Sequence, residues 1–246
     1  MTAPARPPFV LVHGGRHGGW CWGRVAPLLR AAGHDVYTLS LTGLGDRVHL
    51  ARPDIDLDTH ILDVVNLIRY ESLHDVVLVG HSYGGMVITG ALEHVADHVR
   101  RVVFLDAHTP VAGESVFDLV GKEIEDMMTE RARTDGDGWR VPVMDASFWG
   151  LTDPDEIAWI NSKITPQPIR TYQQPIAATD AAWSHPGTYI ECAPTRLAAR
   201  ETDRVKARVA RDPSFRYRVL NSSHEPMVSI PQEVADLLVE AADLDA

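Results

Sequence analysis

Apolar residues along the chain gather in short runs, which alternate with longer segments where they recur every three or four positions. Short runs of apolar and β-branched residues are typical of strands buried on both faces of a parallel sheet. We predict strands within FVLV (9–12), HDVYTLSL (34–41), DVVLVGHS (75–82), RVVFLDA (101–107), TYIECA (188–193) and RYRVLNSS (216–223).

The segments between these runs have helical periodicity. From Leu57 to Glu71 the apolar residues fall on one face of a helix, and the tail PQEVADLLVEAADL (231–244) repeats the pattern after a first-turn proline. Strands that alternate with helices form crossover units within a parallel sheet. The sequence therefore predicts an α/β fold with a doubly wound, mostly parallel six-stranded sheet.

Residues 110–186 interrupt this alternation, because prolines, charges and aromatic residues are mixed there without a strand-like run. We predict a mainly helical cap insertion over the carboxyl edge of the sheet, with 1–109 and 187–246 forming the core of a single-domain chain. The alternative is a set of surface helices whose aromatic residues are buried only for packing.

The stretch GHSYG (80–84) matches G-x-S-x-G, a sharp turn from a strand into a helix that lifts a serine into the open. A buried run precedes Ser82, and the helical GGMVITGALEHV follows it. The context thus supports the motif, and Ser82 is the predicted nucleophile. A serine hydroxyl needs a base to take its proton.

His224 is the predicted base among the twelve histidines. It follows the last strand, at the carboxyl edge where ligands bind in doubly wound sheets, and it comes after the serine as the order Ser…acid…His requires. His13 and His81 lie in glycine turns and favour structural roles. His94 and His98 are one helical turn apart but lack a third metal ligand nearby, so we expect solvent-exposed side chains.

The acid is less directly indicated by the sequence. The loop after the fifth strand begins with residues 194–196 (Pro-Thr-Arg), where an aspartate would be expected. Asp106 ends the fourth strand at the same edge as Ser82, and from there a carboxylate can hold the tautomer of the histidine. We predict Asp106 as the acid; Asp203 and Glu191 are the alternatives, and a turn-capping role for Asp106 is also open.

Two backbone N–H groups are predicted to form the oxyanion hole, those of Tyr83 and Gly15. Gly15 lies in the turn VHGGRHGGW, whose glycines do not follow the G-x-G-x-x-G order of a dinucleotide site. We expect no cofactor and no metal. Pockets are lined mainly by apolar side chains, so a substrate-binding role is predicted for aromatic residues that could equally be core: Trp20, Trp22, Phe148, Trp149 and Trp183.

Composition narrows the possible partners. A formal charge of -11 argues against nucleic acid, and no apolar run approaches the ~20 residues of a membrane span. The N-terminus lacks the apolar core of a signal peptide. Cys21 and Cys192 have no metal or redox spacing, although a disulfide between them stays open. We expect a cytoplasmic monomer or homodimer without membrane or nucleic-acid partners.

Four stretches, FVLVHGGRHGGWCW, LTGLGDR, VGHSYGGMV and NSSHEPMV, together resemble the α/β-hydrolase superfamily. More narrowly they resemble the branch of plant methylesterases, hydroxynitrile lyases and bacterial pyrethroid-hydrolase-like esterases. The resemblance covers nearly the whole chain and implies a cofactor-free serine hydrolase. It carries over Ser82, His224, Gly15 and Tyr83. The aspartate of the plant members' loop is missing, whereas the LDA ending at Asp106 is similar to bacterial members.

The predicted function is hydrolysis of small apolar or aromatic carboxylic esters through an acyl-enzyme. The alternatives are a lyase or C–C bond-cleaving enzyme that uses the same three residues, and a small-molecule receptor with vestigial hydrolysis. The lyases of this branch resemble one another in a threonine and a lysine at the positions of Gly14 and Glu225. Without that lysine, cyanide release is disfavoured, and the complete set of catalytic residues disfavours a receptor.

Overall fold

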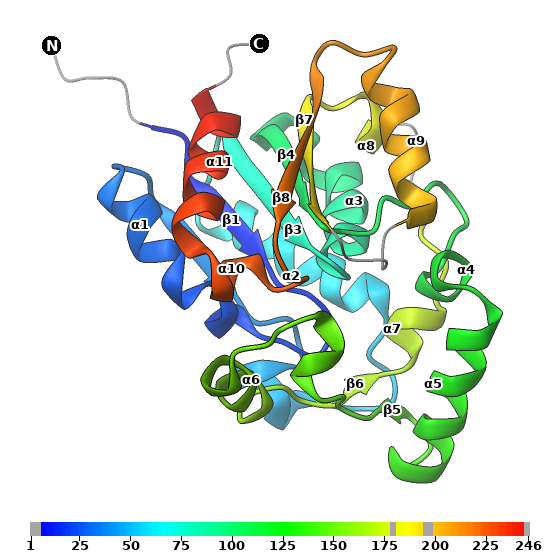
Figure 1. Ribbon diagram of the computed structural model, residues 1–246. Coiled ribbons are helices and arrows are strands. Elements are labelled where there is room, and N and C mark those ends of the chain that lie inside the picture. The colour runs from blue at the N-terminus through cyan, green and yellow to red at the C-terminus, as the bar shows by residue number, and fades with distance from the viewer. Residues whose placement is uncertain (1–5, 178–180, 194–198, 244–246) are drawn as a thin grey trace, which may run out of the picture.

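The computed structural model describes residues 6–177, 181–193 and 199–243, which form a central sheet with helices on both faces (Figure 1). Within these residues the sheet has six strands in the order β2-β1-β3-β4-β7-β8, and each neighbouring pair is parallel. The strands are β1 (Phe9–Val12), β2 (Val36–Leu39), β3 (Val76–His81), β4 (Val99–Leu105), β7 (Gly187–Ala193) and β8 (Phe215–Asn221). The predicted doubly wound sheet is confirmed.

The strand order reverses next to β1. The chain runs from β1 to β2 on one side and then returns to place β3 on the other. Loops that leave the carboxyl ends of β1 and β3 therefore diverge, which opens a crevice at this edge of the sheet. The Gly14–Gly15 turn follows β1, and Ser82 follows β3.

Side chains on the strands alternate between two apolar layers. Val10 and Val12 belong to the cluster on the α2 and α3 face, whereas Phe9 and Leu11 belong to the cluster with α1 and α11. Such two-sided burial explains why the strands read as continuous apolar runs. The helices of the core are η1 (Gly19–Arg24), α1 (Ala26–Ala31), η2 (Gly45–Leu50), α2 (Leu57–Tyr70), α3 (Gly84–Val95), η3 (Ala96–His98), α9 (Ala199–Val209), α10 (Pro226–Ser229) and α11 (Pro231–Asp243).

The segment 110–186 is mainly helical. Its elements α4 to α7 lie beyond the carboxyl ends of the strands (Figure 1), and α8 packs against α3. A two-residue antiparallel ladder, which the sequence did not indicate, joins β5 to β6. The elements are α4 (Val116–Val120), α5 (Lys122–Asp135), β5 (Arg140–Val141), η4 (Ala146–Trp149), α6 (Pro154–Asn161), β6 (Gln167–Pro168), α7 (Arg170–Gln173) and α8 (Ala181–Ser184).

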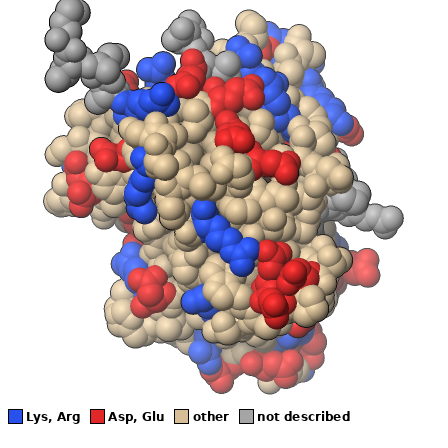
Figure 2. All heavy atoms as spheres, turned by 60° about the vertical axis from the view of Figure 1, so that its left-hand side comes forward, with Lys and Arg blue, Asp and Glu red and all other residues tan. Residues whose placement is uncertain are grey.

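Charged side chains are spread over the surface. On the face seen in Figure 2, lysine and arginine are interspersed with aspartate and glutamate rather than gathered into one basic patch. None of the helices in the described ranges has the length and apolar character needed to cross a membrane.

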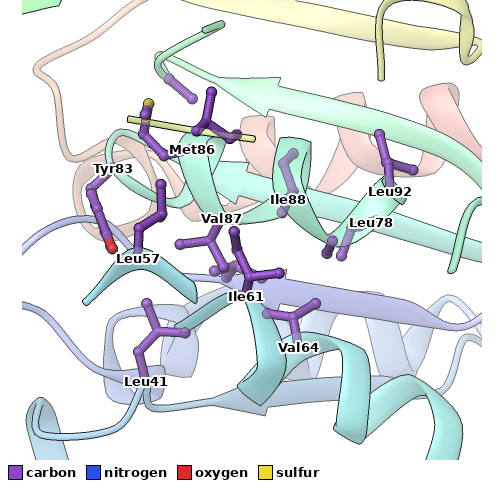
Figure 3. Close-up of a cluster of buried hydrophobic side chains, with 14 of the residues drawn as sticks. Leu41, Leu57, Ile61, Val64, Leu78, Tyr83, Met86, Val87, Ile88 and Leu92 are labelled. Atoms are coloured by element: carbon purple, nitrogen blue, oxygen red, sulfur yellow. The ribbon is translucent and has the colours of Figure 1, made fainter. Parts of the chain in front are cut away.

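Close packing of α3 on α2 fixes the helix that follows Ser82. Leu57, Ile61 and Val64 of α2 meet Val87 of α3 in the apolar cluster shown in Figure 3. Gly90 permits this contact, because a Cβ atom there would overlap the Ile61 side chain. The first turn of α3 is therefore held in place immediately after the predicted nucleophile.

Candidate active site

Ser82 occupies a sharp turn between β3 and α3. Its φ of 51° is a left-handed conformation that non-glycine residues seldom adopt. The Ser82 N–H donates to the carbonyl oxygen of Leu105 at 3.3 Å, and its own carbonyl accepts from the His108 N–H at 3.1 Å. Gly84 allows the turn to pass close to β1, since a Cβ there would come 2.8 Å from the Val12 oxygen. The turn has the geometry that G-x-S-x-G predicts.

His224 and Asp106 lie side by side although 118 positions separate them. The distance between His224 Nδ1 and Asp106 Oδ2 is 2.5 Å, and both side chains are buried. The His224 N–H donates to the Trp149 oxygen at 2.9 Å, and the His224 carbonyl accepts from His81 Nε2 at 2.8 Å. The backbone of His224 is thus held from two sides.

Asp106 ends β4 with a φ of 43°. Its N–H donates to the Ile190 oxygen at 2.7 Å, and its second carboxylate oxygen accepts from the Cys192 N–H at 3.2 Å. The other two acids considered from the sequence lie elsewhere: Glu191 is half-buried on β7, and Asp203 is exposed on α9. Neither of these borders the cavity described below.

Burial and charge act in opposite directions on His224. Burial alone would lower its pKa, but the hydrogen bond to Asp106, the charge of Asp106 and the charge of Glu225 outweigh burial and raise the pKa above 6.5. Burial lowers the pKa of His13 to about 3, and burial with the charges of His224 and His17 places the pKa of His81 well below 6.5. His13 and His81 are therefore neutral at pH 7.

The predicted nucleophile, base and acid border one cavity of about 90 Å³. Gly15 and Tyr83 also line it, as do Phe148 and Trp149. The remaining wall comes largely from the 110–186 segment and is mostly apolar: Val116, Val120, Met128, Met144 and Tyr172. Only Ser82 among residues 81–90 is not fully buried, so the turn opens its side chain toward this cavity.

Three tryptophans of the predicted substrate site lie elsewhere. Trp20 and Trp22 border a different surface pocket beside α1, and Trp183 packs near α9 with its Nε1 donating to the Pro110 oxygen at 2.9 Å. Nothing in the sequence pattern around these tryptophans tells which aromatic side chain faces the cavity. The structure thus brings Phe148 and Trp149 to Ser82, but not Trp20, Trp22 or Trp183.

Gly15 and Tyr83, whose backbone N–H groups are the predicted oxyanion-hole donors, both border the cavity. Neither N–H takes part in any hydrogen bond found between described residues, so both are free to meet a ligand oxygen. Close packing against Tyr172 requires glycine at position 15, because a Cβ there would come 2.5 Å from the hydroxyl oxygen of Tyr172.

Two histidine–carboxylate pairs, one buried and one partly buried, flank the site, and sequence reasoning missed both. His17 Nε2 lies 3.3 Å from Glu225 Oε1, while His17 Nδ1 contacts the Gly15 oxygen at 2.7 Å. Glu225, at the position where related lyases have a lysine, is buried against His17 and does not line the cavity. His108, which does line it, meets Glu201 of α9 at 3.1 Å.

The described residues contain no cluster of three or more histidine, cysteine, aspartate or glutamate side chains able to hold a metal ion. Cys21 and Cys192, between which a disulfide was left open, are both buried free thiols.

The sequence matches the alpha/beta hydrolase family over residues 9–237, and the chain belongs to this family. It is 37% identical to a carbendazim hydrolyzing esterase from Nocardioides sp. (strain SG-4G), over 94% of this chain and 97% of that protein. It is 28% identical to a pheophorbidase from Raphanus sativus, over 95% and 93% of the two chains.

The fold agrees with a solved structure of an extracellular α/β-hydrolase from a Paenibacillus species. The TM-score is 0.84 at 23% identity, covering 97% of this chain and all of the other. The predicted resemblance to the esterase branch of the α/β-hydrolases is confirmed.

Proposed function

We propose that this α/β-hydrolase cleaves small carboxylic esters through an acyl-enzyme on Ser82. The observation that carries the proposal is the 2.5 Å contact of His224 with Asp106 at a cavity that Ser82 also borders. The relatedness to esterases across nearly the full chain supports the same reaction class. The chain is a carboxylic ester hydrolase, and the roles of its residues are our assignment.

In this mechanism Ser82 Oγ attacks the ester carbonyl while His224 Nε2 takes the hydroxyl proton. Negative charge develops on the carbonyl oxygen, where the N–H groups of Gly15 and Tyr83 stabilise it. The alcohol then leaves with the proton from His224. A water molecule, whose proton His224 accepts, then attacks the acyl-enzyme. Ser82 takes that proton as it leaves, and the carboxylic acid is released. Asp106 keeps a proton on Nδ1 of His224, which leaves Nε2 free to act as base.

The shape of the cavity supports a small ester. Its volume of about 90 Å³ is well below the ~300–1,000 Å³ usual for ligand pockets, and its wall is mostly apolar. Phe148 and Trp149 on this wall support an apolar or aromatic substituent. The position where related lyases have a lysine holds Glu225, which is turned toward His17, and this supports an esterase over a cyanide-releasing lyase.

We also propose a cytoplasmic monomer or homodimer with a small ester as its partner molecule. The two free buried thiols support a reducing compartment. The interspersed charges of the face in Figure 2 support the absence of a nucleic-acid partner.

The test is Ser82→Ala with 4-nitrophenyl acetate and butanoate as substrates. We expect kcat/KM to fall by about 10⁴-fold or more with an unchanged melting temperature. A fluorophosphonate should label the wild-type protein but not the variant. Ser162→Ala, which removes an exposed hydroxyl on the surface, is the control and should keep full activity. Ester hydrolysis that survives Ser82→Ala would refute the role of Ser82.

A further inference from the structure

Arg16 places a cation in the wall of the cavity. The residue is only 5% exposed, and its Nε and Nη2 atoms are buried without a hydrogen-bond partner in the part of the chain that the structure describes. No hydrogen bond donated by Nη1 is found there either. Burying a guanidinium without an acceptor is unfavourable. Such a group fits a site where a ligand provides the missing acceptor.

The backbone of Arg16 is fixed by the segment that covers the sheet edge. Its N–H donates to Gln167 Oε1 at 2.7 Å, and its carbonyl accepts from the Thr165 N–H at 2.9 Å. The residue has a φ of 65°, and its guanidinium lies over the Tyr172 ring at 5.8 Å. Contacts from β6 and its flanking residues therefore hold the left-handed backbone of Arg16 in place.

No carboxylate in the described part of the chain forms an ion pair with Arg16. Among the described residues, the cavity wall contains one carboxylate, that of Asp106, which already contacts His224 and the Cys192 N–H. Much of the rest is apolar, including Val116, Val120 and Met128. A planar guanidinium in such surroundings selects a carboxylate, which it can bind with two parallel hydrogen bonds.

We infer that Arg16 binds a carboxylate group of the substrate, so that the enzyme favours esters that also carry a carboxylate. This inference rests on the proposed esterase function and deepens it by naming the substrate class. Because Arg16 follows Gly15 directly, a carboxylate bound to it would anchor the substrate next to the predicted oxyanion hole.

The turnover test compares esters that differ mainly in charge. Mono-4-nitrophenyl glutarate is paired with 4-nitrophenyl pentanoate to place the carboxylate on the acyl side. To place it on the alcohol side, 4-acetoxybenzoate is paired with 4-acetoxybenzamide. The measured quantity is the ratio of kcat/KM for the charged ester to that for its neutral partner, because a change beside Gly15 alters both values.

In Arg16→Met this ratio should fall by about 10- to 100-fold for at least one pair, the usual effect of losing hydrogen bonds to a charged group. Arg16→Lys keeps the charge but loses the planar fork, and we expect an intermediate ratio. Arg52→Met removes an exposed cation that pairs with Asp54, and it should leave the ratio unchanged. Ratios for both pairs that are the same in Arg16→Met and wild type would overturn the inference.

A binding measurement separates this inference from the proposed function. In a Ser82→Ala background, calorimetry with benzoate and benzamide needs no turnover. Benzoate should bind more weakly by about 10-fold or more after Arg16→Met, with benzamide much less affected. If Arg16→Met weakens the binding of benzoate and benzamide equally, or weakens neither, the inference is overturned. If wild type hydrolyses none of the four esters, the esterase proposal fails, while this measurement still decides the role of Arg16.

Discussion

At the scale of single residues, the cavity concentrates unusual backbone conformations. Among the described residues, six non-glycine positions have positive φ, and three of them, Arg16, Ser82 and Asp106, line the cavity. Each such conformation costs about 1–3 kcal/mol, which the surrounding structure must offset. Here two of the three are turns at the carboxyl ends of parallel strands, where the bend carries the side chain off the sheet and into the crevice.

Asp106→Asn tests the assignment of the acid. An amide can hydrogen-bond to the wrong tautomer of His224 and lacks the charge that stabilises the imidazolium, so we expect kcat to fall by about 10⁴-fold. The charge of Asp106 also raises the pKa of His224. The residual activity should therefore decline at lower pH than in wild type as the solution is acidified, because His224 would stay neutral to lower pH. A pH profile of kcat/KM measures both effects.

Asp203→Asn is the matched control for this change. Asp203 is exposed on α9 and does not border the cavity, so we expect wild-type activity and an unchanged profile. If Asp203→Asn proves more harmful than Asp106→Asn, the acid belongs to the later loop.

What the sequence reveals at this scale depends on whether a residue acts through local or tertiary neighbours. Ser82 could be found because its turn has a local signature, and His224 because strand order places it at the correct edge. The partners of Arg16 and Glu225 are set by chain segments more than a hundred positions away. Neither could be recognised as a buried charge before the tertiary packing was known.

At the scale of elements, the turn after β3 works because α3 can approach its neighbours closely. Gly80 and Gly84 face each other across the turn, where a Cβ on Gly80 would come 2.7 Å from the Gly84 oxygen. Gly85 lies against the loop after β4, and a Cβ there would overlap the His108 carbonyl oxygen. The same loop donates the His108 N–H to Ser82. The spacing between α3 and this loop therefore sets the position of the nucleophile.

Gly85→Ala should disturb this element. Backbone cannot move aside as a flexible side chain can, so we expect the free energy of unfolding to fall by about 3 kcal/mol, and activity to drop as the loop shifts from Ser82. Urea unfolding and ester hydrolysis measure the two effects. Gly23→Ala in η1, where a Cβ meets nothing within 4 Å, should change stability by less than about 0.5 kcal/mol. Equal stabilities of the two variants would contradict this account of the turn.

Elements of the sheet were predictable and those of the insertion largely were not. The strand at Phe9–Val12 was predicted with its exact bounds, and the helix from Leu57 ends one residue before the predicted end. Burial on both faces imposes a continuous apolar run, so a strand can be read directly from the sequence. In residues 110–186 the elements are short and each buries only a few scattered side chains. The apolar residues there follow no regular spacing that shows which face lines the cavity.

At the scale of the whole molecule, buried neutral histidines link the fold to pH. His13 uses both ring nitrogens: Nδ1–H donates to the Gly14 oxygen at 2.7 Å, and Nε2 accepts from the Leu41 N–H at 3.0 Å. Burial lowers the pKa of His60 as well as those of His13 and His81. His224 differs, because its pKa is raised. Its contribution to the free energy of unfolding is present below pH 6.5 and is lost as the pH rises through the raised pKa.

Acid should therefore destabilise the protein through these histidines. Below pH 6.5 the unfolded chain takes up a proton at His13 that the folded chain does not bind until about pH 3, so the free energy of unfolding falls between these values. His13 alone accounts for a loss on the order of 4 kcal/mol over this range, with a slope of about 1.4 kcal/mol per pH unit. Reversible urea unfolding at several pH values from 7 to 4 measures the slope.

Two variants assign this slope to its source. His13→Gln removes the titrating group. The free energy of unfolding should therefore fall less steeply between pH 6 and 4, by about 1.4 kcal/mol per pH unit, even if the variant is less stable throughout. His94→Gln changes an exposed histidine and should keep the wild-type slope. Because the comparison concerns slopes and not absolute stability, a lost hydrogen bond to Leu41 does not obscure it. A wild-type slope in His13→Gln would show that acid unfolding has another origin.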